Sequence, residues 1–149
     1  MNAYETINDV LVHLFNEILD LEEKAIITEE FKDISNNDMH IIEAIGLGED
    51  STMSLVARKM GITAGALTTA MNALVKKHYV VRNCSEVDRR VVYISLTEKG
   101  RKAYAHHQKF HMQMADAAIA ELTEEEVQIL AKTLSHLSTF FRSYGDVHS

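Results

Sequence analysis

Residues 54–77 of this chain have the sequence SLVARKMGITAGALTTAMNALVKK. Apolar side chains recur at three- and four-residue spacing on both sides of Gly61, which predicts two amphipathic helices joined by a tight turn. The first helix is expected from Met53 to Met60. The second is expected from Ala64 to about Lys77, with Thr63 as its N-cap. Two short helices around a tight turn are typical of a helix-turn-helix.

The second of these helices is predicted to have an apolar inner face and a polar outer face. The outer face consists of small, hydroxylated, amide or basic residues: Thr63, Gly65, Thr68, Thr69, Asn72 and Lys76. Such a surface suits the major groove of DNA, because Thr offers a methyl to thymine or a hydroxyl to phosphate, and Asn pairs with adenine. The alternative is a polar helix face that meets only solvent.

The pattern then changes to β-branched and aromatic residues at 79–84 and 91–96, which predicts a two-stranded β-hairpin. Its charged turn carries Asp88, Arg89 and Arg90. A projecting hairpin can place an arginine in the narrow minor groove, and Asp88 can orient one of the two arginines through a charge-assisted hydrogen bond. A solvated charged turn is the alternative interpretation.

Charge is distributed unevenly along the chain. The formal net charge is −7, which alone argues against a nucleic-acid partner. However, residues 58–102 hold ten Lys/Arg and three acids, whereas the other residues hold five Lys/Arg and nineteen acids. A basic block inside an acidic frame is the electrostatic pattern of a phosphate-binding surface. Acidic solvated helices are the alternative explanation.

Composition predicts a cytoplasmic single-chain unit of 149 residues. A single Cys excludes an intrachain disulfide framework. No apolar run is long enough to span a bilayer, and the N-terminus lacks a signal-peptide pattern. No phosphate-binding glycine loop, nucleophile elbow or flanked pair of carboxylates is present, so an enzyme is not expected.

Long helices are expected on both sides of the helix-turn-helix. Helical periodicity predicts a first helix over about 4–27, and Asn37 or Asp38 is expected to cap a helix that ends at Ile45. Thr97 is expected to cap a helix to about residue 120, and a capping box that begins at Thr123 starts a last helix to about residue 144. The fold class is therefore mainly α, a winged helix-turn-helix. We expect a DNA-binding lobe over 36–100 and dimerisation helices over 1–30 and 101–149, because their apolar stripes need a partner.

The sequence resembles the MarR family of regulators over nearly its whole length. The matching segments are SLVARKMGI at 54–62, TTAMNALVKK at 68–77 and DRRVVYISLTEKG at 88–100. The resemblance implies a homodimeric transcriptional regulator that binds palindromic double-stranded DNA. A protein-interaction module without DNA binding is the alternative of another class, and it leaves the basic block without a role.

Within the family, the chain is similar to the branch that represses fatty-acid synthesis in Gram-positive bacteria. The similar residues are FKDIS at 31–35, Met39-His40, Glu86 with the segment 88–92, and Phe110-His111. This resemblance implies a repressor with acyl carrier protein as co-repressor and no required cofactor. Apolar side chains of the flanking helices are candidates for an acyl pocket, with a plain core or dimer interface as the alternative: Leu14, Phe15, Ile18, Phe110 and Met114.

Histidines suggest a second hypothesis. His107 and His111 lie four residues apart, so they share one side of a helix, a spacing that can hold a metal ion. His40 and a carboxylate of Glu22 or Glu23 would complete the site, and this set resembles the zinc-sensing branch of the family. That branch has a denser histidine run, so the alternative is that these histidines pack and form hydrogen bonds beneath the DNA-binding lobe. The lone Cys84 is interpreted as an ordinary strand thiol.

Overall fold

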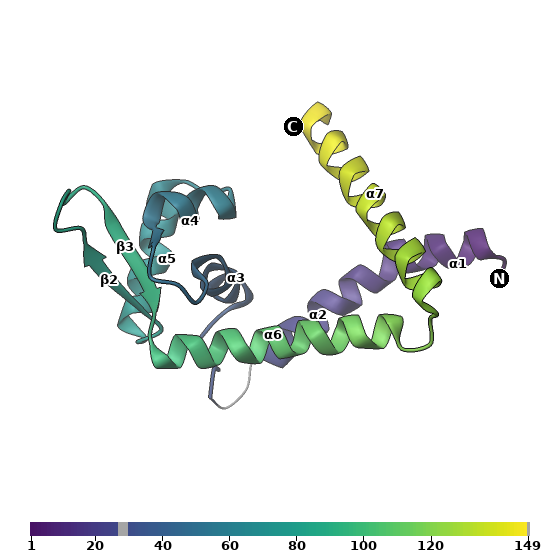
Figure 1. Ribbon diagram of the computed structural model, residues 1–149, viewed down its shortest axis with the longest axis horizontal. Helices are drawn as coiled ribbons and strands as arrows, with labels where there is room; N and C mark the ends of the chain where they lie inside the picture. The colour runs from purple at the N-terminus through teal and green to yellow at the C-terminus, as the bar shows by residue number, and fades with distance from the viewer. Residues whose placement is uncertain (27–29, 149) are drawn as a thin grey trace. The chain divides into compact units, whose positions relative to one another are not determined.

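Helices form most of the part of the chain that the computed structural model describes, residues 1–26 and 30–148 (Figure 1). The chain divides into two units, residues 1–110 and 111–149. The elements of the first unit are α1 (Ala3–Asp9), the π-helical η1 (Val10–Leu14), α2 (Phe15–Ile26), α3 (Asn36–Ile45), β1 (Ser51–Thr52), α4 (Met53–Met60), α5 (Ala64–Lys76), β2 (Val80–Cys84), β3 (Val92–Leu96) and the start of α6 (Glu98–Ile119). The second unit contains the rest of α6 and α7 (Glu124–His148).

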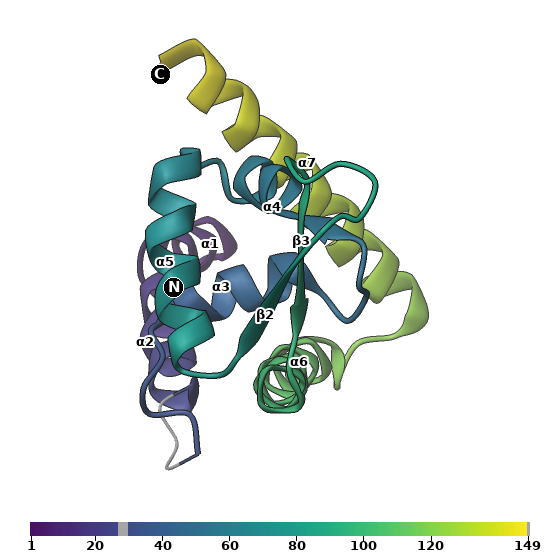
Figure 2. The same ribbon diagram turned by 90° about the vertical axis from the view of Figure 1, so that its left-hand side faces the viewer.

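The core of the first unit lies between α3, α4, α5 and the sheet (Figure 2). Side chains from each of these elements are almost fully buried: Met39, Ile41, Ile42, Val56, Leu67, Met71, Leu74, Val80 and Ile94. The expected spacing of apolar residues on both helices of the helix-turn-helix is thus confirmed. The turn between them ends α4 at Gly61, which has a φ of 65°, in the left-handed region that favours glycine.

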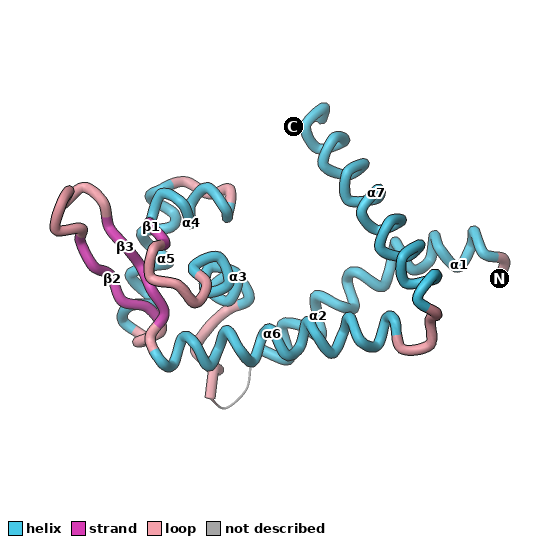
Figure 3. Tube along the Cα trace, viewed as in Figure 1, coloured by secondary structure: helices cyan, strands magenta, loops and turns pink. Residues whose placement is uncertain are grey.

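The sheet has three antiparallel strands in the order β1-β3-β2, shown in magenta in Figure 3. Only β2 and β3 were expected from the sequence. The additional strand β1 has two residues, with Ser51 paired to Ile94 and Thr52 to Tyr93. A strand of two residues is too short to show a periodic pattern in the sequence. Its formation depends on pairing with the neighbouring strand rather than on local sequence.

Helix starts differ from expectation at one place. Ser35, and neither Asn37 nor Asp38, caps α3. The Ser35 hydroxyl accepts a hydrogen bond from the Asp38 amide at 3.1 Å, and the Asp38 carboxylate accepts one from the Ser35 amide at 3.1 Å. Asp38 is therefore the third residue of a capping box instead of the cap itself. The capping box that begins at Thr123 is confirmed at the start of α7.

The first and last helices also depart slightly from the prediction. The first is helical from Ala3 to Ile26, but η1 interrupts its α-helical hydrogen bonding. Residue 27, the expected end, lies outside the described residues. The last helix continues to His148, four residues past the expected end, because the exposed Gly145 does not interrupt it. Within the described ranges, no helix combines the length and the hydropathy that a membrane span requires.

The junction of the hairpin and α6 is tightly packed. Tyr79 is fully buried, and its hydroxyl donates a hydrogen bond to Asp33. Lys99 lies over the Tyr79 ring, 4.3 Å from its centroid. The Thr97 amide donates to the Tyr79 carbonyl at 3.0 Å, and Gly100 lies directly against that carbonyl. These contacts attach the start of α6 to the end of the helix-turn-helix.

Candidate nucleic-acid interface

The outer face of α5 presents every residue that the sequence analysis assigned to it. Thr63, Gly65, Thr68, Thr69, Asn72 and Lys76 are all exposed. They share this face because Leu67, Met71 and Leu74 are fully buried on the opposite side. The face is therefore accessible to solvent in the single chain.

The threonine hydroxyls of this face are engaged with the helix itself. Thr63 caps α5 by accepting a hydrogen bond from the Ala66 amide at 3.1 Å. Thr68 donates to the Ala64 carbonyl at 2.8 Å, and Thr69 donates to the Gly65 carbonyl at 3.2 Å. Because Thr68 and Thr69 use their protons inside the helix, they offer outward a methyl group and oxygen lone pairs rather than a free donor.

Asn72 has a partner that sequence reasoning did not identify. Its side-chain oxygen Oδ1 accepts a hydrogen bond of 2.7 Å from Nη1 of Arg82, which lies on β2. Both residues are exposed. The signal that could have revealed Arg82 is its position two residues after Val80. The two side chains lie on the same face of the strand, and a charged residue there interrupts the apolar inner face.

The hairpin tip separates the roles of its two arginines. The Asp88 carboxylate accepts hydrogen bonds from the backbone amide, Nε and Nη2 of Arg90, at 3.0–3.1 Å. The hydrogen bond with the Arg90 side chain is the main reason why the pKa of Asp88 is lowered. Arg89 is exposed and makes no hydrogen bond or ion pair with any described residue. Asp88 thus orients Arg90, while Arg89 extends into solvent.

Several cations of the basic block bind within the chain. Lys59 and Arg101 donate to the backbone carbonyls of Ala44 and Leu47. The ion pairs are Lys77 with Asp38 at 3.8 Å and Lys99 with Asp33 at 3.7 Å. The charge count of residues 58–102 therefore overstates the number of cations that are available to phosphate.

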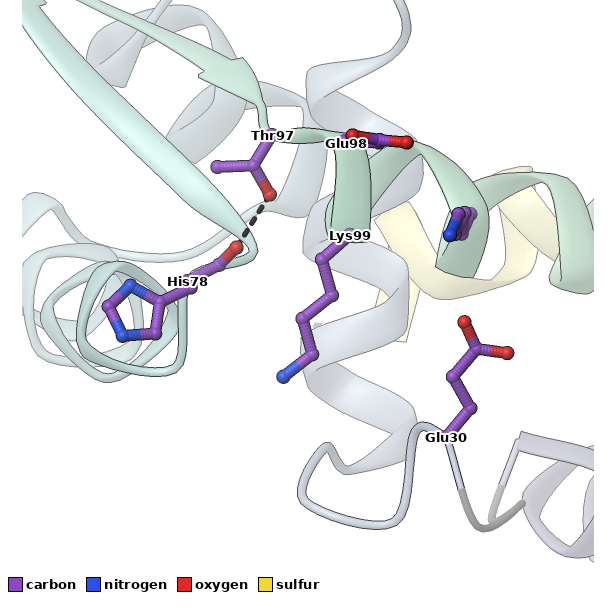
Figure 4. A pocket seen from close by; sticks show the side chains of 6 residues that line it. Glu30, His78, Thr97, Glu98 and Lys99 are labelled. Carbon is purple, nitrogen blue, oxygen red and sulfur yellow. Dashed lines mark hydrogen bonds between the residues drawn. The ribbon is translucent and has the colours of Figure 1, made fainter.

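A hollow beside the start of α6 is lined by His78, Thr97, Lys99, Lys102, Glu98 and Glu30 (Figure 4). The Thr97 hydroxyl donates to the His78 carbonyl across this hollow, and Lys99 donates to the Lys77 carbonyl. Charges of both signs line this hollow, and the polar groups of Thr97 and Lys99 already form hydrogen bonds with backbone carbonyls. We therefore interpret it as part of the hairpin junction rather than as a ligand site.

The five apolar pocket candidates are distributed over both units. Leu14 and Phe15 are 41% and 49% exposed, and Ile18 is half-buried. Phe110 is half-buried near the end of the first unit, and Met114 belongs to the second. An acyl pocket that they line together stays a prediction.

His107 joins three helices of the first unit. Its side chain is 1% exposed, and its Nε2 lies 2.8 Å from Oε1 of Glu43 on α3 and 3.2 Å from Oε1 of Glu22 on α2. Glu22 is also buried, which favours it over the exposed Glu23 as the carboxylate of this cluster. His40 lies close, with its Nδ1 3.6 Å from Oε2 of Glu43 and its ring centroid 6.3 Å from that of His107. His111 follows one turn later on α6.

Comparison with known proteins finds transcriptional regulators. Residues 22–107 match the family described as transcriptional regulator SarA/Rot. The solved structure of Streptococcus pneumoniae FabT in complex with DNA is 40% identical, with a TM-score of 0.84, over 94% of this chain and 98% of FabT. The regulator PchR of Bacillus subtilis, of the HTH type, is 26% identical over 121 residues, 78% of this chain and 72% of PchR. A solved MarR family transcription regulator shares the fold, with a TM-score of 0.76 over 96% of this chain and 92% of its own at 14% identity.

Proposed function

Because this chain belongs to the MarR family of winged-helix transcriptional regulators, we propose that it is a homodimeric repressor of fatty-acid-synthesis genes. The observation that carries its DNA binding is the exposure of the α5 outer face together with Arg89 at the hairpin tip. In this proposal α5 enters the major groove and Arg89 enters the adjacent minor groove. The uncompensated Lys and Arg side chains contribute salt-dependent affinity by releasing counterions from the phosphates.

Exposed apolar side chains support the homodimer. They are numerous on α1, η1 and α2, and again on α7: Tyr4, Ile7, Leu14, Phe15, Ile129, Leu134, Phe140, Phe141 and Tyr144. Apolar surface of this extent on a single chain marks an interface. We propose that a second copy of the chain covers it, which would place two copies of α5 about 34 Å apart, one turn of DNA.

The DNA-binding part of the proposal is tested with a palindromic promoter fragment. Fluorescence anisotropy of the purified protein is measured at several salt concentrations, with a random duplex of equal length as the control. We expect tighter binding to the palindrome, and an affinity that falls steeply with salt. Absence of binding to either duplex at low salt would refute the proposal.

The fatty-acid part of the proposal rests on the likeness to FabT, which covers nearly all of both chains. We propose that acyl carrier protein that carries an acyl chain acts as co-repressor, and that the acyl group contacts the apolar side chains of the first unit at Leu14, Phe15, Ile18 and Phe110. A co-repressor must bind the DNA-competent state more tightly than the other state. Acyl-loaded carrier protein should therefore increase operator affinity, whereas the carrier without an acyl chain should not. Equal effects of both forms would contradict this role.

A zinc-responsive regulator is the second candidate, and the group of Glu22, His107 and His111 favours it, because each offers a ligand atom and these atoms lie within 4.8 Å of one another. Imidazoles and carboxylates are donors that zinc accepts, and His40 is a further candidate ligand. However, Nε2 of His107 already contacts the carboxylates of Glu22 and Glu43, so a metal would have to replace these contacts. Elemental analysis after zinc loading and gel filtration tests this candidate. A metal content near zero would remove it.

A further inference from the structure

We propose that Arg82 is a positioning residue for base recognition: it fixes the side-chain amide of Asn72, so that the two residues read the DNA as a unit. This inference rests on the proposed function, since it takes the outer face of α5 as the surface that contacts bases. It adds a residue of β2 to a recognition surface that the sequence analysis assigned to α5 and the hairpin tip.

The strand pairing explains why Arg82 reaches α5. In β2, Val80 pairs with Leu96 and Arg82 pairs with Ile94. Directly paired residues of antiparallel strands have their side chains on the same face. Because Val80, Leu96 and Ile94 are all buried, Arg82 begins on the face of the sheet that packs against the helices. β2 contacts α5 directly, and the guanidinium therefore extends across the edge of that helix to Asn72.

The chemistry of the contact fixes the orientation of the amide. A guanidinium has only donors, so the atom of Asn72 that faces Arg82 at 2.7 Å must be the carbonyl oxygen Oδ1. The amino group on the other branch of the amide then points away from Arg82. An asparagine without such a partner can turn its amide over, which exchanges donor and acceptor at the same place. Arg82 therefore limits Asn72 to one of two hydrogen-bonding patterns.

The surroundings show that Arg82 is available for this role. Arg82 makes no ion pair with a carboxylate among the described residues, in contrast to Arg90 at the hairpin tip. The bond with Asn72 is exposed, so it contributes little to folding. Its consequence is local order on the surface that faces DNA.

The experiment compares four variants of the full-length protein on a panel of operators. Each position of the half-site is changed in turn to each of the other three base pairs, and the same change is made in the second half-site. The dissociation constant of each protein variant for each duplex is measured at fixed salt. The variants are Asn72→Ala, Arg82→Ala, Arg82→Lys and the double variant Asn72→Ala/Arg82→Ala. Lys76→Ala is the matched control, because it removes one positive charge from the same helix face. Melting temperatures within about 2 °C of the unmodified protein establish that the exposed substitutions leave the fold intact.

We expect Asn72→Ala to reduce discrimination about 5- to 20-fold at one or two positions. Arg82→Ala should reduce discrimination at the same positions, and the double variant should lose no more than either single variant, because coupled residues are not additive. Arg82→Lys should keep overall affinity but recover discrimination only in part, since lysine is a flexible point donor. Lys76→Ala should weaken all duplexes by a similar factor.

Two results would overturn the inference. One is an Arg82→Ala protein that keeps full discrimination at the positions that depend on Asn72. The other is an even loss on all duplexes, as for Lys76→Ala, which would make Arg82 a simple phosphate contact. Failure of the unmodified protein to bind any duplex would instead refute the proposed function, so the two failures are distinguishable.

Discussion

Replacement of Gly100 by alanine tests the packing of the hairpin against α6. A Cβ atom at this position would lie 2.2 Å from the backbone oxygen of Tyr79 and 3.2 Å from Cβ of Leu96. The first distance is far shorter than any non-bonded contact. Since the obstructing atom belongs to the backbone, rotation of a side chain cannot relieve it. The start of α6 must move away from Tyr79.

Three effects determine how Gly100→Ala changes the free energy of unfolding: two destabilise the protein and one stabilises it. Overpacking of this kind costs about 1–3 kcal/mol. The movement also weakens the hydrogen bond from the Thr97 amide to the Tyr79 carbonyl, which costs about 1 kcal/mol. Alanine stabilises a helix by about 1 kcal/mol relative to glycine. The net expectation is a destabilisation of about 1–3 kcal/mol, or a melting temperature lower by about 3–10 °C.

Thermal unfolding followed by circular dichroism at equal protein concentration measures this effect. Gly65→Ala is the matched control, because Gly65 also lies in a helix and a Cβ there meets nothing within 4 Å. We expect the control to melt at the same temperature as the unmodified protein or slightly above it. A Gly100→Ala protein as stable as the control would refute the packing argument.

Three further predictions concern other residues. Arg89→Ala should weaken operator binding by about 1–3 kcal/mol at fixed salt, because it removes the hairpin arginine that has no partner among the described residues; an unchanged dissociation constant would contradict this. Tyr79→Phe should cost about 1 kcal/mol at neutral pH, because it removes the hydrogen bond that lowers the pKa of Asp33. A lowered carboxyl pKa in the folded state stabilises the protein above the unfolded pKa, and this contribution is lost as the pH falls through the folded value. The cost should therefore shrink in urea unfolding experiments below about pH 4, and a cost that stays constant with pH would exclude this cause. His107→Ala should destabilise the chain by about 3 kcal/mol in urea, because it removes the buried imidazole between Glu22 and Glu43; a loss below about 1 kcal/mol would show that the cluster contributes little to stability.

Local sequence predicted the elements of the DNA-binding lobe well. The helix-turn-helix follows from apolar spacing around Gly61, and the hairpin follows from the change to β-branched residues. Both signals act within a few residues, so a linear reading detects them. The cap of α3 was misplaced because Ser35, Asn37 and Asp38 are all good caps, and only the backbone geometry distinguishes a cap from the third residue of a capping box.

The sequence predicted which residues form the candidate site, but not which hydrogen bonds those residues make with one another. The outer face of α5 follows from helical periodicity, and its residues are exposed as expected. The partner of each polar group was not predictable. Asp88 was expected to orient one of two arginines, and the structure selects Arg90. Arg82 was not considered at all, because its contact with Asn72 depends on how β2 packs against α5.

Neighbouring residues were enough to predict the long helices, the helix-turn-helix, strands β2 and β3, the apolar face of each helix, and the set of polar residues on α5. Helix periodicity, capping and β-propensity are properties of neighbouring residues, so no tertiary information was needed. Tertiary structure alone decided the strand β1, the bond between Asn72 and Arg82, and the burial of His107 between Glu22 and Glu43. These features join residues that are distant in sequence, and their geometry exists only after the core has brought strands and helices together.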